Sequence, residues 1–322
     1  DEVYPQYFPK QNTELEAYQQ IEKDLLDAVL YAPDNTPGNK TLFTKSVART
    51  LLAKIYAEKP LRDYTKVIQY CDEVKADGFD LVDDFSDLFG MNAAGTDAKM
   101  RNTKESILEA QFTSGAGNWC TWMFGRDLVN WNNNFTWAKW VTPSRDLISA
   151  FKQEGDEVRF KESIVYYDCN WSNYYPSDNY PFMYKCRSAN SSIIKYRYAD
   201  VLLLKAEALI MQDTPDLEGA ADIIDKVRDR AKLGALPTSV RSNKNVLLNA
   251  LLKERRLELA FEGQRWFDLV RLDKVEEVMN AVYAKDSGRK AQIYTFDKNS
   301  YRLPIPQSVI DANDKIHQNP GY

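Results

Sequence analysis

The sequence predicts a mostly α-helical protein in which a tetratricopeptide-like repeat scaffold carries a loop-rich, aromatic-rich insert. Three observations indicate this fold: helical periodicity of apolar residues near both ends, a recurring helix pair of about 35 residues, and a long aperiodic middle. We expect helical repeats in residues 1–78 and in residues 196–322, which also include a C-terminal tail. Residues 79–195 are predicted to form a ligand-binding lobe.

The first helix is predicted to begin after Thr13, because Thr13 and Glu16 have the spacing of a capping box. The apolar residues of this helix fall on one face: Leu15, Tyr18, Leu25 and Val29. A helix pair follows between Thr44 and Gly78, and its first helix stops before Pro60. Its second helix has apolar residues at spacings of three and four: Tyr64, Val67, Cys71 and Val74.

This helix pair recurs later in the chain. LLAKIYAE from Leu51 resembles LLLKAEAL from Leu202, which predicts a second copy over residues 198–232. A third pair, VLLNALLKERRLELAFEG and RWFDLVRL, surrounds Gly263. Repetition at this period is typical of tetratricopeptide units.

The third pair is densely charged. Its ionisable residues are Glu254, Arg255, Arg256, Glu258, Glu262, Arg265, Asp268 and Arg271. Two such carboxylates would be needed for glycoside cleavage, but alternating charges on neighbouring helices favour ion pairs that hold the helices together. We expect the adjoining Trp266 and Phe267 to lie in the core.

Composition excludes several classes of function. The chain has 322 residues, 42 Lys+Arg against 47 Asp+Glu, and a net charge of −5, which argues against nucleic-acid binding. Since no apolar run reaches about 18 residues, no membrane-spanning helix is predicted. The only histidine is His317, near the end of the chain, so a Ser-His-Asp triad or a His-rich zinc site is not supported. We predict no cofactor and no metal.

Two further features receive structural interpretations. The four cysteines show no CxxC spacing; Cys71 fits a core position, and any disulfide among Cys120, Cys169 and Cys186 stays open. The acidic stretch DGFDLVDDFSDLF from Asp77 lacks the ligand pattern of an EF-hand, so we expect a solvated loop there.

The middle of the chain contains the candidate binding residues. Five of the seven tryptophans fall within 22 residues, interleaved with amides and charges, and a tyrosine cluster follows between Tyr166 and Tyr184. Because sugar rings have apolar faces and hydroxyl edges, flat aromatic side chains beside hydrogen-bonding groups suit them. We predict stacking by Trp119, Trp122 and Trp131, hydroxyl contacts from Asn118, Arg126 and Asn132, and a secondary wall of Trp171 and Tyr174.

The chain resembles the SusD/RagB glycan-binding lipoproteins of the Bacteroidetes outer membrane. The strings that resemble the family occur in the family order: ESILEAQF, TPSRDLISAFKQEGDEVRF, KYRYADVLLLKAEAL, KVRDRAKL, LLKERRLELAFEGQRWFDLVRL, LPIPQSVI and HQNPGY. The resemblance implies an all-helical tetratricopeptide-like scaffold with a variable lobe. It further implies a surface lipoprotein, without catalysis, that captures oligosaccharides for a SusC-like TonB-dependent transporter.

Family members are usually longer, and they begin with a signal peptide and a lipidated cysteine. This sequence resembles them from inside their first region, so we expect the lipid anchor and part of the glycan site to lie outside this chain. Two other functions compete with glycan capture: a tetratricopeptide scaffold that binds peptides in its groove, and a glycoside hydrolase with two carboxylates.

Overall fold

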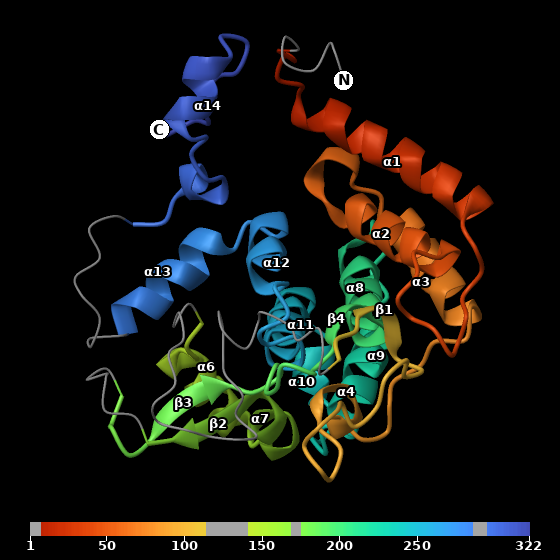
Figure 1. Cartoon of the computed structure of the whole chain (residues 1–322), viewed down its shortest axis with the longest axis vertical. Coiled ribbons are helices and arrows are strands. Elements are labelled where there is room, and N and C mark those ends of the chain that lie inside the picture. The colour runs from red at the N-terminus through yellow and green to blue at the C-terminus, as the bar shows by residue number, and fades with distance from the viewer. Residues whose placement is uncertain (1–7, 114–140, 169–174, 286–294) are drawn as a thin grey trace.

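The structure, a computed structural model, describes residues 8–113, 141–168, 175–285 and 295–322. These residues are mostly helical, and two small antiparallel sheets join them (Figure 1). In chain order the elements are α1 (Glu14–Tyr31), α2 (Lys45–Ala57), η2 (Lys59–Leu61), α3 (Tyr64–Ala76), α4 (Ser86–Phe89), β1 (Ser106–Ala110), α6 (Arg145–Glu154), α7 (Glu157–Ser163), β2 (Ile164–Tyr167), β3 (Tyr180–Met183), β4 (Ile193–Arg197), α8 (Tyr198–Met211), α9 (Leu217–Arg230), α10 (Thr238–Arg241), α11 (Lys244–Glu258), α12 (Arg265–Arg271), α13 (Val275–Lys285), η3 (Lys298–Tyr301) and α14 (Gln307–Ala312).

The predicted helix pairs are confirmed: α2 with α3, α8 with α9, and α11 with α12. The Thr13–Glu16 capping box is present at the start of α1. Gly78 follows α3 with φ of 94°, a conformation that glycine adopts without a Cβ clash. The sequence signals for these ends were local caps and breakers, and the helices end where those signals lie.

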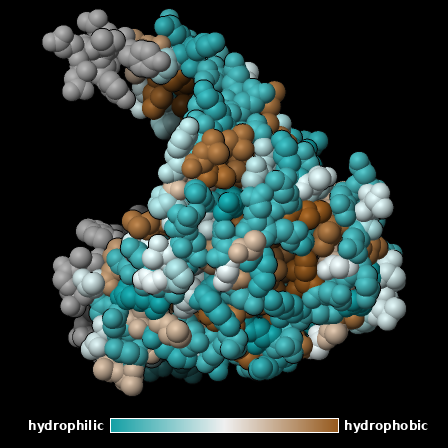
Figure 2. Space-filling view, turned by 90° about the vertical axis from the view of Figure 1, so that its right-hand side faces the viewer, coloured by the Kyte–Doolittle hydropathy of each residue, from teal (hydrophilic) through white to brown (hydrophobic). Residues whose placement is uncertain are grey.

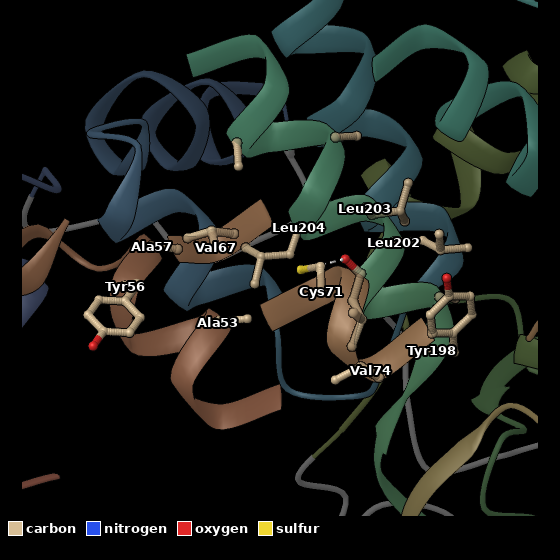
Figure 3. Packing of buried hydrophobic residues seen from close by; sticks show 14 of the residues in the cluster. Ala53, Tyr56, Ala57, Val67, Cys71, Val74, Tyr198, Leu202, Leu203 and Leu204 are labelled. Carbon is tan, nitrogen blue, oxygen red and sulfur yellow. Dashed lines mark hydrogen bonds between the residues drawn. The ribbon is translucent and has the colours of Figure 1, made fainter. Parts of the chain in front are cut away.

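One apolar core joins the first two helix pairs. Leu204 of α8 points toward Val67 of α3 and Ala57 of α2, and all three are buried (Figure 3). Small residues such as Ala53 let the helix backbones approach closely. Cys71 occupies the predicted core position, and its thiol donates to the main-chain oxygen of Val201 at 3.5 Å. The repeats are therefore fixed to one another by side chains at helical spacing.

Buried ion pairs hold the later helices to the sheet that β1 and β4 form. Glu258 of α11 accepts hydrogen bonds from Arg197 at 2.5 Å and from Arg159 at 3.1 Å, and it also pairs with Arg230. Glu105, beside β1, bonds Arg197 at 2.7 Å. Although burial raises the pKa of Glu258, the ion pairs with Arg230, Arg197 and Arg159 outweigh it and hold that pKa well below its usual value.

A second buried cluster ties α12 to α8. Arg255 bonds Asp268 at 2.9 Å and Asp200 at 2.7 Å, while Arg271 bonds Glu207 at 2.7 Å. Lys54 of α2 completes the cluster on Asp200 at 2.7 Å. These contacts confirm that the charges of the late helices form ion pairs, and most of them connect different helices rather than successive turns of one.

The lobe below the repeats is built on the β2–β3 ribbon, with α6 and α7 beside it (Figure 1). β1 pairs with β4 in the other sheet. The string ESILEAQF contains β1, and the string SRDLISAFKQ contains most of α6. Phe151, Ile164 and Phe182 belong to the separate apolar core of this lobe.

Three expectations about single residues or segments were wrong. Phe267 is 61% exposed, since the buried side chains of α12 are those of Asp268, Leu269 and Arg271. Leu15 is 46% exposed, although it lies on the apolar face of α1. The acidic stretch is not simply a solvated loop: it contains α4, and Phe85 and Phe89 pack into a small apolar cluster there.

The two ends of the described chain lie side by side (Figure 1). The main-chain nitrogen of Gln11 donates to the oxygen of Lys315 at 3.3 Å, and Asn313 donates to the oxygen of Pro9 at 2.9 Å. The face that includes α1 shows apolar patches among hydrophilic residues (Figure 2). Within the described ranges, no helix is both long enough and apolar enough to span a bilayer.

Candidate functional site

A hollow of about 490 Å³ opens in the lobe beside the β2–β3 ribbon. One side is formed by the loop that follows α4, from Gly90 to Lys99, and the other by the ribbon. The lining is aromatic and polar: Ser86, Gly90, Met91, Asn92, Ala93, Ala94, Gly95, Lys99, Glu162, Tyr167, Tyr184 and Arg187. This mixture is what binding sites for small polar molecules contain.

Strand pairing places both tyrosines of the hollow on one face of the ribbon. Tyr167 is opposite Tyr180, and the main-chain nitrogen of Tyr184 donates to Ser163 at 2.8 Å, which continues the same ladder. Because side chains alternate along a strand, Tyr167 and Tyr184 share a face while Tyr166 lies on the other. Burial raises the pKa of Tyr167, so its hydroxyl stays protonated at neutral pH.

Arg187 fixes the floor of the hollow. Its guanidinium lies 3.6 Å from the ring centroid of Tyr184, which is close for a cation–π contact. The same group donates to the carboxylate of Glu162 at 2.8 Å and to the main-chain oxygen of that residue at 3.0 Å. Arg187 and Glu162 are both buried, so the tyrosine ring rests on a rigid, charge-balanced base.

The opposite wall is a loop held by its own polar groups. Asn92 accepts a hydrogen bond from the main-chain nitrogen of Thr96 at 2.9 Å. Asn190, next to the other sheet, donates to the main-chain oxygen of Thr96 at 2.7 Å. Lys99 is paired with Asp84 and Asp87, at 3.1 Å and 2.7 Å. The loop thus presents main chain and amide groups with its charges already neutralised.

These features suit an uncharged polar ligand with an apolar face. Glu162 is the single carboxylate in the described lining of the hollow, and Arg187 neutralises it. The two tyrosines offer ring surface and hydroxyls, while Asn92 and the glycine-rich loop offer hydrogen-bonding edges. Such a site can hold a sugar ring without an acid and base pair to cleave it.

The structure does not test the predicted site residues. Trp119, Trp122, Trp131, Asn118, Arg126, Asn132, Trp171 and Tyr174 all lie outside the described residues. The chain on either side of the longer segment is anchored: Arg101 pairs with the main-chain oxygen of Phe112, and Thr142 bonds the Tyr180 hydroxyl at 2.9 Å.

The tyrosine cluster divides into two groups. Tyr175 and Tyr180 are buried in the core of the lobe, and Tyr175 donates to the main-chain oxygen of Pro143 at 2.6 Å. Tyr167 and Tyr184 line the hollow. Sequence reasoning missed Arg187, Glu162 and Asn92 as site residues, because no periodicity or motif marks them.

Comparisons with known proteins agree with this fold. The sequence model of the SusD family matches residues 181–322. Two SusD-like proteins of Formosa agariphila, P38 and P2, are 43% identical over 99 residues and 36% identical over 143 residues. Those stretches cover 29% and 42% of this chain. They cover only 19% and 27% of the relatives.

Solved structures extend the likeness to nearly the whole chain. A SusD-like protein from Bacteroides fragilis aligns with a TM-score of 0.71 at 22% identity, over 97% of this chain and 72% of that one. Residues 181–322 belong to the SusD family by their match to its sequence model, and the rest of the chain shares the SusD fold. A laminarin binding SusD-like protein aligns with a TM-score of 0.67 at 24% identity, over 95% of this chain and 68% of its own. At these identities the structures show the SusD fold alone.

Proposed function

We propose that this SusD/RagB member is a non-catalytic glycan-binding protein that captures oligosaccharides or polysaccharide at the cell surface. The observation that supports this most is the hollow in which Tyr167 and Tyr184 line one wall and hydrogen-bonding groups line the other. A neighbour of the same fold is named for laminarin binding, which is consistent with a saccharide ligand.

The absence of catalysis is part of the proposal. Carboxylates with a raised pKa are the usual candidates for a general acid, and burial raises the pKa of both Glu254 and Asp156. Both carboxylates, however, are bound to Arg159 at 2.5 Å and lie inside the protein. A glycosidase needs such a group beside the substrate, and these two are used to balance a buried arginine.

The tryptophan segment is proposed to extend the site. In this interpretation Trp119, Trp122 and Trp131 stack on sugar rings, Asn118, Arg126 and Asn132 bind hydroxyls, and Trp171 and Tyr174 add a secondary wall. Trp171 and Tyr174 belong to residues 169–174. In sequence these residues come directly after Asp168, which follows Tyr167 of the hollow. Residues 79–195 would thus bind ligand, while residues 1–78 and 196–322 would supply the scaffold.

We infer the partner and location from the family. A SusD/RagB member would act at the outer membrane as a surface lipoprotein, delivering glycan to a SusC-like TonB-dependent transporter. Co-purification of the full-length protein with that transporter from outer membranes tests the partner. A protein recovered only from the periplasm, or without the transporter, would contradict it.

Glycan binding is tested with purified protein and a panel of polysaccharides that includes laminarin, by affinity electrophoresis and then calorimetry. A ring that covers about 60 Å² of sugar contributes about 1.5 kcal/mol at 25 cal/mol per Å². Tyr184→Ala is therefore expected to weaken binding about tenfold.

Tyr166→Ala is the matched control, because Tyr166 belongs to the same ribbon but packs near Phe160, with ring centroids 6.3 Å apart, away from the hollow. Equal losses of affinity in both variants would point to damage of the lobe rather than loss of a contact. If the parent binds no polysaccharide of the panel, the proposed function fails.

A further inference from the structure

A second hollow, of about 330 Å³, lies where α6, the end of α11 and the start of α12 meet. Its described lining contains three arginines and no aspartate or glutamate: Ser144, Leu147, Arg255, Arg256, Leu259, Ala260, Phe261, Gly263, Gln264, Arg265 and Trp266. This composition differs from that of the first hollow, where the charges are balanced. The charged side chains of this described lining are therefore all arginines.

The positive charge of this hollow comes mainly from Arg265. Arg255 is neutralised by Asp200 and Asp268, and Arg256 is paired with Asp146 at 2.7 Å. Arg265 donates to the main-chain oxygen of Leu252 at 2.9 Å, and within the described ranges no carboxylate oxygen lies within 4.0 Å of it. The neighbouring buried arginines all have such a partner.

Burial, with the nearby charge of Arg256, lowers the pKa of Arg265 to about 10. The guanidinium is still charged at neutral pH, but its charged form is poorly solvated. An anionic group that reached it would form charge-assisted hydrogen bonds, which are about twice as strong as neutral ones. The planar guanidinium matches a carboxylate in two parallel bonds.

The rest of the lining fits a ring beside that carboxylate. Leu147, Phe261 and Trp266 form an apolar wall, and the Trp266 ring is braced by Phe296, with centroids 6.2 Å apart. The Ser144 oxygen caps α6 by accepting from Leu147 at 3.1 Å, so its hydroxyl hydrogen is left to donate. An acidic peptide would offer the carboxylate without a sugar ring, whose apolar face suits the wall and whose hydroxyl suits Ser144.

We propose that this hollow binds the carboxylate and ring of a uronic acid unit, with Arg265 as its anion-binding residue, so that the glycans captured by this protein include acidic ones. The inference rests on the proposed glycan-binding function but concerns a different hollow from the one that contains Tyr184. The class of ligand it names is a hexuronate-containing oligosaccharide.

The experiment compares oligosaccharides of galacturonate and of glucuronate with their carboxyl-reduced, neutral counterparts, by calorimetry at low ionic strength. The parent should bind at least one acidic oligosaccharide about tenfold or more tightly than its neutral counterpart. Arg265→Gln should abolish this preference and leave neutral binding unchanged. Arg265→Lys, which retains the charge without the planar fork, should retain part of it.

Lys152→Gln is the matched control, since Lys152 is an exposed cation of α6 outside the lining of the hollow. Lys152→Gln should leave the affinities for the acidic and for the neutral oligosaccharides unchanged. Equal binding of acidic and neutral oligosaccharides by the parent, or a preference that persists in Arg265→Gln, would overturn the proposal. So would competition by oligoglutamate as strong as that of the uronate, because the site would then recognise charge alone.

The two proposals fail in different ways. If neutral polysaccharides bind in a Tyr184-dependent manner but acidity has no effect, glycan binding stands and the uronate site is wrong. If neither acidic nor neutral saccharides bind at all, both are wrong.

Discussion

The helical core and the β2–β3 lobe bury their residues in different ways. In the core, side chains such as Leu203 of α8 are completely buried, and the charges beside them are matched in pairs. In the lobe, Tyr175 and Phe182 are buried, but Tyr167 and Tyr184 remain partly open to a hollow. The lobe therefore retains surface for a ligand, whereas the core uses nearly all of its surface for folding.

This difference predicts where substitutions act. A change in the helical core should lower the free energy of unfolding. A change in the hollow beside the β2–β3 ribbon should alter the affinity for glycan with little effect on stability. A substitution of a fully buried apolar side chain in the helical core that spared stability yet abolished affinity would contradict this difference.

The largest effect on stability is expected at Glu258. Glu258→Gln removes a charge that neutralises Arg159, Arg197 and Arg230, and all four side chains are buried. Each arginine keeps another carboxylate, but the buried network loses one negative charge, and breaking a buried ion pair by removing one partner costs about 3–5 kcal/mol. Urea unfolding followed by circular dichroism measures this loss.

Glu277→Gln is the control for Glu258→Gln, because the Glu277 side chain is 67% exposed and pairs with Lys274 on the surface. Its effect should stay below about 1 kcal/mol. Similar midpoints for the two variants would mean that the buried network contributes no more than a surface ion pair.

The next effect is expected from Leu203→Ala in α8. Leu203 is fully buried between helices, so truncation leaves a cavity and should cost about 2–5 kcal/mol. Affinity for glycan should be unchanged once the protein is folded. Leu30→Ala, at a position of α1 that is 66% exposed, should cost almost nothing. A Leu203→Ala protein that melts like the parent yet loses ligand would reverse the assignment of roles.

Much of the helical scaffold was predictable because its signals are local. Caps such as Thr13 and breakers such as Pro60 and Gly78 act within one or two turns. The repeat of Val67, Cys71 and Val74 at helical spacing shows which face is buried, whatever it packs against. The recurrence of the helix pair then indicates the architecture.

The hollow beside the β2–β3 ribbon was not predictable, because it is formed by residues that are far apart in the sequence. Asn92 and Arg187 meet only after the ribbon and the loop have packed together. Phe267 was misplaced for a related reason: an aromatic residue in a charged helix looks like core, yet the buried face of α12 includes Asp268 and Arg271, which bind Arg255 and Glu207 of other helices. Charge pairing across the fold overrode the hydrophobic pattern.

A smaller effect is expected in the pH dependence of stability. Burial lowers the pKa of Lys185 to about 8, against 10.5 for an ordinary lysine, even though Glu262 lies 2.6 Å away. Between these two values the unfolded chain holds the proton more tightly than the folded one. The contribution of Lys185 to stability therefore increases as pH rises from about 8 to 10.5, by at most about 1.4 kcal/mol per pH unit.

The measurement is urea unfolding at pH 7.5 and pH 9.5 for the parent and for Lys185→Met. The difference in free energy of unfolding between parent and variant should shift in favour of the parent at the higher pH. Since Arg197 also binds Glu262, at 2.7 Å, that carboxylate keeps a partner in the variant. Parallel pH profiles for the two proteins would show that Lys185 does not titrate in this range.

The smallest effect on stability is expected from the tryptophans of the proposed binding segment. Trp119→Ala, Trp122→Ala and Trp131→Ala should each weaken glycan binding about tenfold, which is about 1.4 kcal/mol, because a sugar face buries limited apolar area against one ring. The melting temperature should hardly change. If these rings instead form a second apolar core, truncation would lower stability by several kcal/mol, as at Leu203. Thermal unfolding and calorimetry on the same three proteins separate the two cases, and a loss of stability larger than the loss of affinity would move this segment from the ligand-binding region to the scaffold.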